Sequence, residues 1–209
     1  GDPFWADFLG CGGTANGIAC ADPVLFYAPM VGGPTVVGST GNTLYFGTNK
    51  LYRSIDQGTT MTSVGSAGLS ARISAIAVAP QNDDIRLVGT SSGAVLLQTT
   101  PGATTLTTVT GAIAPAARYV GRTAIDPVDA NKAYVCLNGF GLAAGQHVWK
   151  TTNLLSGSPT WVASGNGIPD TPVNAFVIDP LDTNTLYAGT DIGVFKSTDG
   201  GANWIPFSN

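Results

Sequence analysis

The strongest constraint on this chain is a segment that recurs along it. Its fullest copy joins four short hydrophobic runs, at residues 173–180, 184–190, 193–199 and 204–207. The same order recurs upstream at 73–99 and 120–161, and a first copy is clear from residue 42 onward. Gly47, Gly89, Cys136 and Gly189 occupy equivalent positions, with spacings of 42, 47 and 53 residues. Periods of this length indicate propeller blades or solenoid units.

The composition favours β-strands. Only 11% of the 209 residues are charged, 28 are Gly and 13 are Pro, and all 13 acidic residues are Asp. Runs of Val, Ile, Thr, Tyr and Phe alternate with turn residues about every 8–12 positions, which is typical of all-β sandwiches, barrels and propellers. Together with the repeat, this predicts an all-β propeller of about four blades, each a four-stranded antiparallel sheet. The predicted blades are 24–68, 69–112, 113–166 and 167–209, after an N-terminal strand and loop at 1–23.

Two polar segments mark the predicted hairpin between the third and fourth strands of a blade. Ser54, Asp56 and Gly58 precede Met61 in the first, and Ser197, Asp199 and Gly201 precede Trp204 in the second. An Asp at the entry to a tight turn accepts hydrogen bonds from backbone N–H groups a few residues on, while Gly supplies a positive φ. The large apolar residue then fills the space between sheets. We therefore expect Asp56 and Asp199 to stabilise turns and not to catalyse a reaction.

These segments resemble the Asp-box, or BNR, repeats of β-propellers that include sialidases, xyloglucanases and the sortilin ectodomain. The copies at 54–61 and 197–204 match the motif closely, whereas those near 99–106 and 151–161 are degenerate, with Pro101 and Asn153 near the Asp position. The resemblance covers residues 24–209. It implies a secreted, bacterial type of propeller whose boxes lie on the outer hairpins, away from the ligand face.

The two ends of the chain resemble each other. Residues 4–10 are similar to residues 203–209, the last strand of the fourth blade. Residues 4–10 are therefore either the last strand of an absent preceding blade or a strand that closes the ring. Propellers with these boxes usually have six to eight blades, so we expect a fragment, a ring completed by two copies, or a small four-bladed ring. Open blades would favour self-association, into an oligomer or a filament.

The cysteines and the charge indicate an exported protein. Cys11 and Cys20 flank a Gly-rich loop that a disulfide would close, and the alternative is two unpaired thiols. Cys136 lies in a predicted buried strand as a small core residue. We therefore expect an extracellular protein, either released or held at the cell surface or in the periplasm.

Several partner classes are excluded by the sequence. A net charge of −4 with nine scattered basic residues argues against nucleic acid, which requires a Lys/Arg stripe. With His147 as the only histidine and no clustered cysteines, neither a metal site nor a cofactor is expected. No apolar run approaches 18 residues, so no membrane span is expected. Other protein chains, further copies of this chain and glycans are the expected partners.

In propellers the ligand face is built from the loops that precede the inner strands and from those between the second and third strands. The repeat places these loops at 65–72, 111–119 and 165–172, and at 48–50, 90–92, 138–147 and 190–192. The ligand-face candidates are Arg72, Arg118, Tyr119, Phe140, His147, Asp170 and Asp191. Each could equally be an ordinary solvated loop residue. Arg122 differs because it lies inside a predicted inner strand, as a buried paired charge or a channel residue.

Two functions from different classes fit the sequence. The preferred one is a non-catalytic extracellular propeller that acts as a binding or assembly scaffold. The alternative is a xyloglucanase-like or sialidase-like glycoside hydrolase, or a carbohydrate-binding propeller. A glycosidase usually needs two carboxyl groups about 5–10 Å apart, and only Asp170 and Asp191 are placed on the ligand face. Arg72, Arg118 and Arg122 lack the motif context of a sialidase arginine triad, so we expect a protein that is not an enzyme.

Overall fold

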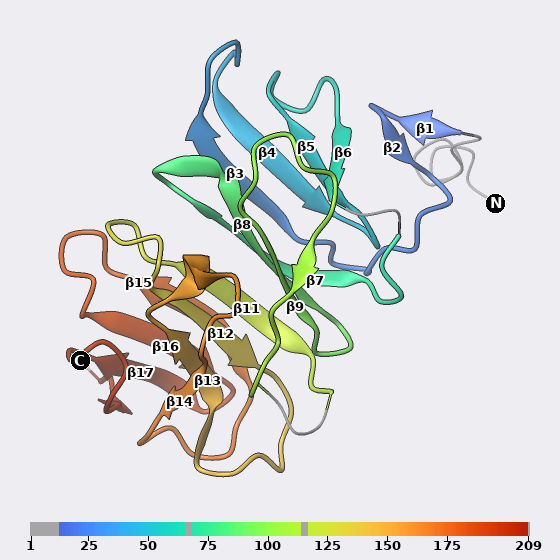
Figure 1. Ribbon diagram of the computed structural model, residues 1–209. Coiled ribbons are helices and arrows are strands. Elements are labelled where there is room, and N and C mark those ends of the chain that lie inside the picture. Colours follow the sequence, from blue (N-terminus) through green and yellow to red (C-terminus); the bar gives the residue numbers. More distant parts are fainter. Residues whose placement is uncertain (1–12, 66–67, 114–116, 209) are drawn as a thin grey trace.

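The computed structural model describes residues 13–65, 68–113 and 117–208, and these form β-strands almost throughout (Figure 1). Four four-stranded antiparallel sheets follow one another along the chain, and we call them blades 1 to 4. A short hairpin of β1 (Thr14–Ala15) and β2 (Ile18–Ala19) precedes them. This arrangement confirms the predicted all-β class and the four-stranded blades.

Within every blade the four strands pair in chain order. Blade 1 contains β3 (Met30–Thr35), β4 (Asn42–Gly47), β5 (Leu51–Ser54) and β6 (Thr62–Gly65). Blade 2 contains β7 (Ile73–Ala79), β8 (Asn82–Thr90), β9 (Val95–Gln98) and β10 (Thr107–Thr108). Blade 3 contains β11 (Val120–Ile125), β12 (Ala133–Leu137), β13 (Gly145–Thr151) and β14 (Val162–Gly165), with a turn of 3-10 helix, η1 (Leu154–Ser156), before β14. Blade 4 contains β15 (Val173–Ile178), β16 (Leu186–Thr190), β17 (Gly193–Ser197) and β18 (Ile205–Pro206).

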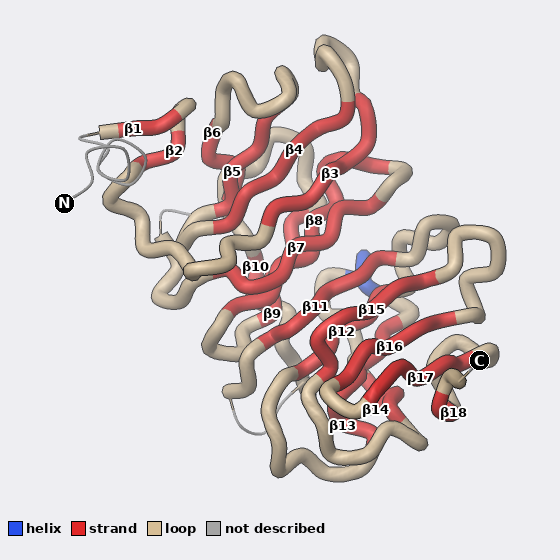
Figure 2. The backbone as a smooth tube through the Cα atoms, turned by 180° about the vertical axis from the view of Figure 1, so that it is seen from behind, coloured by secondary structure: helices blue, strands red, loops and turns tan. Residues whose placement is uncertain are grey.

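The first strands of the blades, β3, β7, β11 and β15, lie side by side through the middle of the molecule (Figure 2). We call them the inner strands. Each packs against the inner strand of the next blade, so blades 1 and 4 occupy the two ends of the row. Hydrophobic clusters fill the boundaries between blades 1 and 2, blades 2 and 3, and blades 3 and 4. The core is therefore a series of similar interfaces.

The burial of a strand follows its place in this row. Every residue of β12 in blade 3 is buried, because blades 2 and 4 cover both faces of that sheet. In β4 of blade 1, buried residues alternate with less buried ones, because blade 2 covers only one face. A period of two is what a strand shows when one side packs against a core.

The turns between β5 and β6 and between β17 and β18 contain the two boxes. Asp199 Oδ1 accepts hydrogen bonds from Asn203 N at 3.0 Å and from Ser197 Oγ at 2.7 Å. Ser197 Oγ accepts in turn from Gly201 N at 2.9 Å. The hydrogen bonds from Asn203 and Ser197 lower the pKa of Asp199 to about 2. The carboxylate and the hydroxyl thus satisfy backbone N–H groups that the tight turn leaves unpaired.

The same contacts recur at the first box. Ser54 Oγ donates to Asp56 Oδ1 at 2.6 Å and accepts from Gly58 N at 2.9 Å, and Asp56 Oδ1 also accepts from Thr60 N at 2.8 Å. The hydrogen bond from Ser54 is the main reason that the pKa of Asp56 lies below its usual value.

The degenerate copy in blade 3 reproduces the arrangement with neutral groups. Asn153 Oδ1 accepts from Thr151 Oγ1 and from Thr160 N, both at 2.8 Å. Because an amide oxygen makes the same contacts as a carboxylate, the turn requires an acceptor and not a negative charge.

Trp161 follows the degenerate box of blade 3 and Trp204 follows the box of blade 4. Each packs on the segment that leaves the preceding blade. Trp204 Nε1 donates to Ser164 O at 2.7 Å, and Trp204 N donates to Asn166 O at 2.8 Å. At the preceding boundary, Trp161 Nε1 donates to Val109 O at 2.8 Å. Gly167 has φ 100°, and a Cβ there would lie 2.2 Å from Trp204 O. We call residues 166–168 the blade connector, since they lie in the segment that joins β14 of blade 3 to β15 of blade 4.

Three inner strands carry an irregularity at their second residue. The pairing register shifts between Ile73 and Ala75, between Val120 and Arg122, and between Val173 and Ala175. A bulge of this kind bends the strand and changes the direction of a side chain. It therefore affects the side chains at the start of each inner strand.

Cys136 lies in β12 and is buried, as predicted, and its burial raises the pKa of the thiol. Cys11 falls outside the described residues, so the Cys11–Cys20 disulfide stays a prediction. Residues 4–10 also lie outside them. In the part of the chain that the structure describes, no helix is long and apolar enough to cross a membrane.

Candidate functional site

The loops before the inner strands and the loops after the second strands meet at one end of the blades. Backbone hydrogen bonds join them: Ile73 N donates to Thr48 O at 2.7 Å, Ser91 N to Arg72 O at 2.9 Å, and Asn138 N to Tyr119 O at 2.9 Å. The two boxes follow third strands, which run away from this end, so they lie at the opposite end. We call the end where the inner strands begin the inner-strand face.

A groove of about 480 Å³ opens on this face across blades 1, 2 and 3. Its walls come from the segment before β3 and from the first residues of β3, β7 and β11. The aromatic and charged side chains that line it are those of Tyr27, Tyr119 and Arg122. We call it the inner groove.

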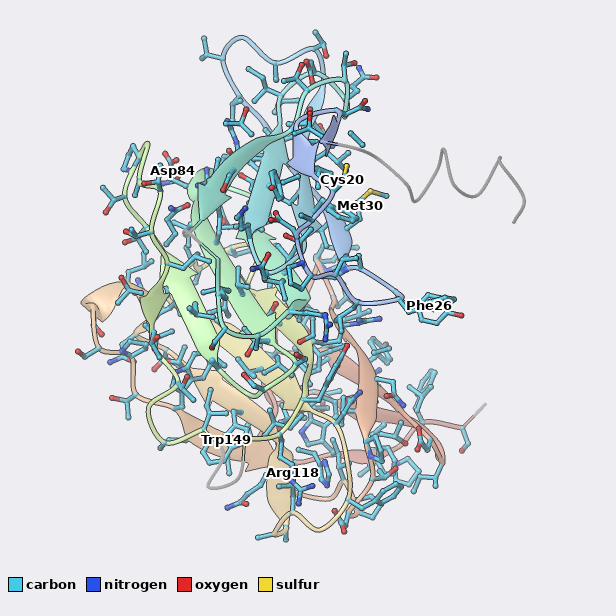
Figure 3. All side chains as sticks on the ribbon, turned by 90° about the vertical axis from the view of Figure 1, so that its right-hand side faces the viewer. Cys20, Phe26, Met30, Asp84, Arg118 and Trp149 are labelled. Carbon is cyan, nitrogen blue, oxygen red and sulfur yellow. The ribbon has the colours of Figure 1, made fainter. Side chains whose placement is uncertain are left out.

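Aromatic rings and a cation line the inner groove. Tyr27 is largely exposed and stands beside exposed Phe26, whose ring lies edge-on to it at 4.9 Å (Figure 3). Tyr119 is 37% exposed. Arg122 is exposed, and its Nη1 donates to Gly121 O at 3.1 Å. Arg122 is therefore not the buried, paired charge that the sequence allowed, and no described carboxylate pairs with it.

A second group of predicted residues surrounds the loop after β12. Asp170, in the segment before β15, accepts hydrogen bonds from Gly141 N at 2.7 Å, Leu142 N at 3.1 Å and His147 Nε2 at 2.9 Å. The hydrogen bond from Gly141 N, followed by that from His147, holds the pKa of Asp170 below its usual value. Asp170 therefore attaches the loop of blade 3 to the segment that enters blade 4.

His147 lies within β13 and is buried, unlike the solvated loop residue that the sequence led us to consider. Its Nδ1 lies 3.4 Å from Leu137 O and its Nε2 faces Asp170. β13 begins at Gly145, two residues before His147. The imidazole ring of His147 therefore lies between the end of β12 and the carboxylate of Asp170. Its role here is to position Asp170.

Two of the remaining candidates lie at this loop and two lie elsewhere. Arg118 lies against the same loop, where a Cβ on Gly139 would be 3.4 Å from its Nη1, and its buried Nε has no partner among the described residues. Phe140, at the tip of that loop, is 58% exposed. Asp191 is exposed and accepts from Asn174 Nδ2 at 2.6 Å, and Arg72 is exposed.

The structure thus brings Arg118, Phe140, His147 and Asp170 together around one loop and places Tyr119 in the inner groove. It does not bring Arg72 or Asp191 into either group. Sequence reasoning missed Tyr27, because the first blade was recognised only from residue 42 onward and its entry segment was not counted among the loops. The adjacent aromatics Phe26 and Tyr27 ahead of β3 were the available signal.

The electrostatics of the face suit binding better than proton transfer. A general acid that works near neutral pH needs a raised pKa, whereas the pKa of Asp170 is lowered and its oxygens are occupied by N–H groups. None of the described residues that line the inner groove carries a carboxylate. Among the described residues, no group of three or more His, Cys, Asp or Glu side chains could hold a metal ion.

Similar folds occur in carbohydrate-active enzymes and in other propellers. An ancestral GH74 enzyme superposes with a TM-score of 0.67 and 24% identity over 90% of this chain and 25% of its own. The GH74 xyloglucanase from Xanthomonas campestris gives 0.60 and 19% over 80% of this chain and 29% of its own. YCF48 bound to a D1 peptide gives 0.55 and 14% over 82% of this chain and 50% of its own.

These likenesses support the β-propeller fold, and the chain spans a quarter to a half of the length of each of these structures. No protein-family model matches the chain. No curated protein matches it either.

Proposed function

We propose that this chain is a non-catalytic, extracellular binding propeller whose inner groove takes a carbohydrate. The observation that carries the proposal is the lining of the groove by Tyr27, Tyr119 and Arg122, with no carboxylate among its described residues. Tyrosine presents an apolar ring with a polar tip, which suits the apolar face and the hydroxyl groups of a sugar ring. Arginine adds fixed hydrogen-bond donors.

The similarity in fold to GH74 enzymes supports this choice of ligand class. A peptide is the other ligand class that a similar structure suggests, since YCF48 was solved bound to a D1 peptide. The inner groove lies on the face where the loops meet, and the Asp-box turns lie at the opposite end. That placement is the one expected of the Asp-box propeller family, to which we assign the chain.

Titration of the protein with xyloglucan oligosaccharides by calorimetry, after a glycan-array screen, tests the proposal. Tyr27→Ala and Tyr119→Ala should each weaken binding about tenfold, because an aromatic contact contributes about 1–1.5 kcal/mol. Phe140→Ala is the matched control, since the exposed fraction of Phe140 lies between those of Tyr119 and Tyr27 and its side chain lies outside the groove. Absence of glycan binding, or binding that neither tyrosine change weakens, would overturn the carbohydrate assignment.

A glycoside hydrolase is the second candidate, favoured by the fold similarity to GH74 enzymes. In that case Asp170 and Asp191 are the acids of the described face, and a polysaccharide and sialoside hydrolysis screen should detect turnover. Turnover that Asp170→Ala or Asp191→Ala abolishes would favour the enzyme over the binding module. Turnover that survives both changes would remove these two residues as its catalysts.

A further inference from the structure

We propose that the open face of blade 4 docks on the open face of blade 1 in a second copy of this chain, as blade 3 docks on blade 4 within one copy. This inference concerns the two ends of the blade row and does not depend on the inner groove. Three observations carry it: the segment that precedes blade 1, the apolar face of blade 4, and the polar groups that cross the boundary between blades 3 and 4.

The hairpin before blade 1 repeats the blade connector. Asn16-Gly17-Ile18 matches Asn166-Gly167-Ile168 in sequence. Asn16 O accepts from Met61 N at 2.6 Å, just as Asn166 O accepts from Trp204 N at 2.8 Å. Met61 and Trp204 are the equivalent residues after the two boxes.

The glycines of these two segments also agree in backbone conformation and in their close contacts. Gly17 has φ 92° and Gly167 has φ 100°, and a Cβ on either would lie 2.2 Å from the carbonyl oxygen of Met61 or Trp204 respectively. Blade 1 is therefore contacted by a connector of the kind that elsewhere arrives from a preceding blade. The face of blade 1 that points away from blade 2 therefore resembles the face of blade 4 that packs on blade 3.

The face of blade 1 that no other described blade covers is apolar. Met30, Leu44, Phe46 and Met61 line a cavity of about 290 Å³ beside the β1–β2 hairpin. Met30 is 62% exposed and projects outward near that hairpin (Figure 3). This face is the counterpart of the surface on blade 4 that Tyr134, Cys136 and Val148 of blade 3 cover.

The far face of blade 4, which no described blade covers, carries four exposed apolar side chains. Val194 is 41% exposed, whereas Val148 and Val95, which have the same pairing position in blades 3 and 2, are both 0% exposed. Val177, Ile205 and Phe207 add 57%, 67% and 45% exposed side chains to the same face. We call this the leading face of blade 4.

Two polar side chains on the leading face are equivalent to two in blade 3 that form hydrogen bonds with blade 4. Tyr134 Oη and Lys150 Nζ of blade 3 both donate to Gly200 O in the box of blade 4, at 3.1 and 2.8 Å. Tyr187 and Lys196 occupy the same positions in blade 4. Among the described residues, neither of these two side chains has a hydrogen-bond acceptor, and Lys196 Nζ instead lies 5.5 Å from the centre of the Tyr187 ring.

Blade 1 offers the matching acceptor. Gln57 occupies in its box the place of Gly200, and Gln57 is exposed. Docking would bring Tyr187 Oη and Lys196 Nζ to Gln57 O of the second copy. Because the chain carries one donor face and one acceptor face, a contact between copies is heterologous, and it either closes into a ring or continues as a filament.

Sedimentation velocity over a range of protein concentrations tests the proposal. The wild-type chain should gain mass as its concentration rises, whereas Val194→Asp and Met30→Asp should each remain monomeric at every concentration. Val162→Asp is the matched control, since Val162 is 55% exposed on β14, away from both end faces, and it should associate like the wild type. Far-UV circular dichroism checks that the variants are folded.

Mixing the two variants gives the decisive result. Val194→Asp retains the blade 1 face and Met30→Asp retains the leading face, so an equimolar mixture should form a heterodimer that grows no further. A wild-type chain that stays monomeric would overturn the proposal. So would variants that associate like the wild type, or a mixture that stays monomeric.

Discussion

At the scale of single residues, Asp199 and Asp170 show how a carboxylate can be prominent in the sequence and still serve the backbone. Asp199 accepts from Asn203 N and Ser197 Oγ, and Asp170 accepts from Gly141 N, Leu142 N and His147. Both therefore hold loops in place. The pKa of each carboxyl is lowered for that reason.

Asp199→Asn should make the contribution of this group to stability independent of pH. In the wild type the pKa of Asp199 is about 2 in the folded chain against a usual 3.8, so folding favours the carboxylate. The stabilisation is complete above the unfolded pKa and is lost as the pH falls from about 4 toward 2. Urea unfolding of both proteins at several pH values should show their difference narrowing over that range.

Asp199→Ala serves as the control for the turn itself. It removes the acceptor at every pH and should cost about 1 kcal/mol near neutrality. Asp199→Asn should retain most of that stability, since Asn153 makes the same contacts in blade 3. A difference between wild type and Asp199→Asn that stays constant from pH 5 to pH 2 would contradict the assignment.

The role of Asp56 and Asp199 was predictable, because a box is a local motif whose hydrogen bonds join residues two to four apart. The role of His147 was not predictable, because it depends on Asp170, 23 residues away in the segment that enters another blade. Tyr27 was missed for a similar reason. Its place in the inner groove is set by β7 and β11, which are distant in sequence.

At the scale of elements, the repeat correctly predicted four-stranded sheets. It did not predict which residues of each strand the neighbouring blades would bury. β12 and β16 have similar sequences, yet β12 is wholly buried and β16 alternates. The difference arises from the neighbouring blade and not from the strand. The blade connector shows the same dependence, since Gly167 is constrained by Trp204 from the next box.

Gly167→Ala should destabilise the protein by about 3 kcal/mol or more, because the new Cβ would meet Trp204 O and the backbone has a positive φ. Gly193→Ala separates these two causes. Gly193 has φ 132° but nothing within 4 Å of a Cβ, so its change should cost only about 1 kcal/mol of backbone strain. Thermal unfolding of both variants checks the order, and equal losses would contradict a steric role for the connector.

At the scale of the whole molecule, successive blades contact one another and little else. Such a chain is stabilised by its sheets and by the interfaces between neighbours, as in other repeat proteins. The boundary between blades 1 and 2 contains a buried charge. Asp83 accepts from Thr43 Oγ1 and Arg53 Nε, both at 2.6 Å, and lies 3.3 Å from Arg86 Nη2.

Asp83→Ala should uncouple blade 1 from the rest. It would leave Arg53 of blade 1 without its ion-pair partner and would remove one of the two carboxylates that pair with buried Arg86, at a cost of about 3 kcal/mol at this boundary. The described tryptophans, Trp149, Trp161 and Trp204, lie in blades 3 and 4. With Trp5→Phe as the background, circular dichroism of the variant should begin to change at a lower urea concentration than tryptophan fluorescence.

In the same background without Asp83→Ala, the two signals should coincide. Asp84→Ala is the matched control, since Asp84 is more exposed and its ion pair with Arg86 should contribute less than about 1 kcal/mol. Coincident transitions in Asp83→Ala would show that the other contacts at this boundary suffice to hold blade 1.

The blade connector has a consequence for how such a chain can change its length. Its contacts with Trp204 depend on one connector and one box, and residues 16–18 make the same contacts with Met61. Duplication or deletion of a whole unit of about fifty residues would therefore recreate a boundary of the same kind at the point of insertion or loss. Gene duplication could lengthen this protein by single units without compensating substitutions elsewhere.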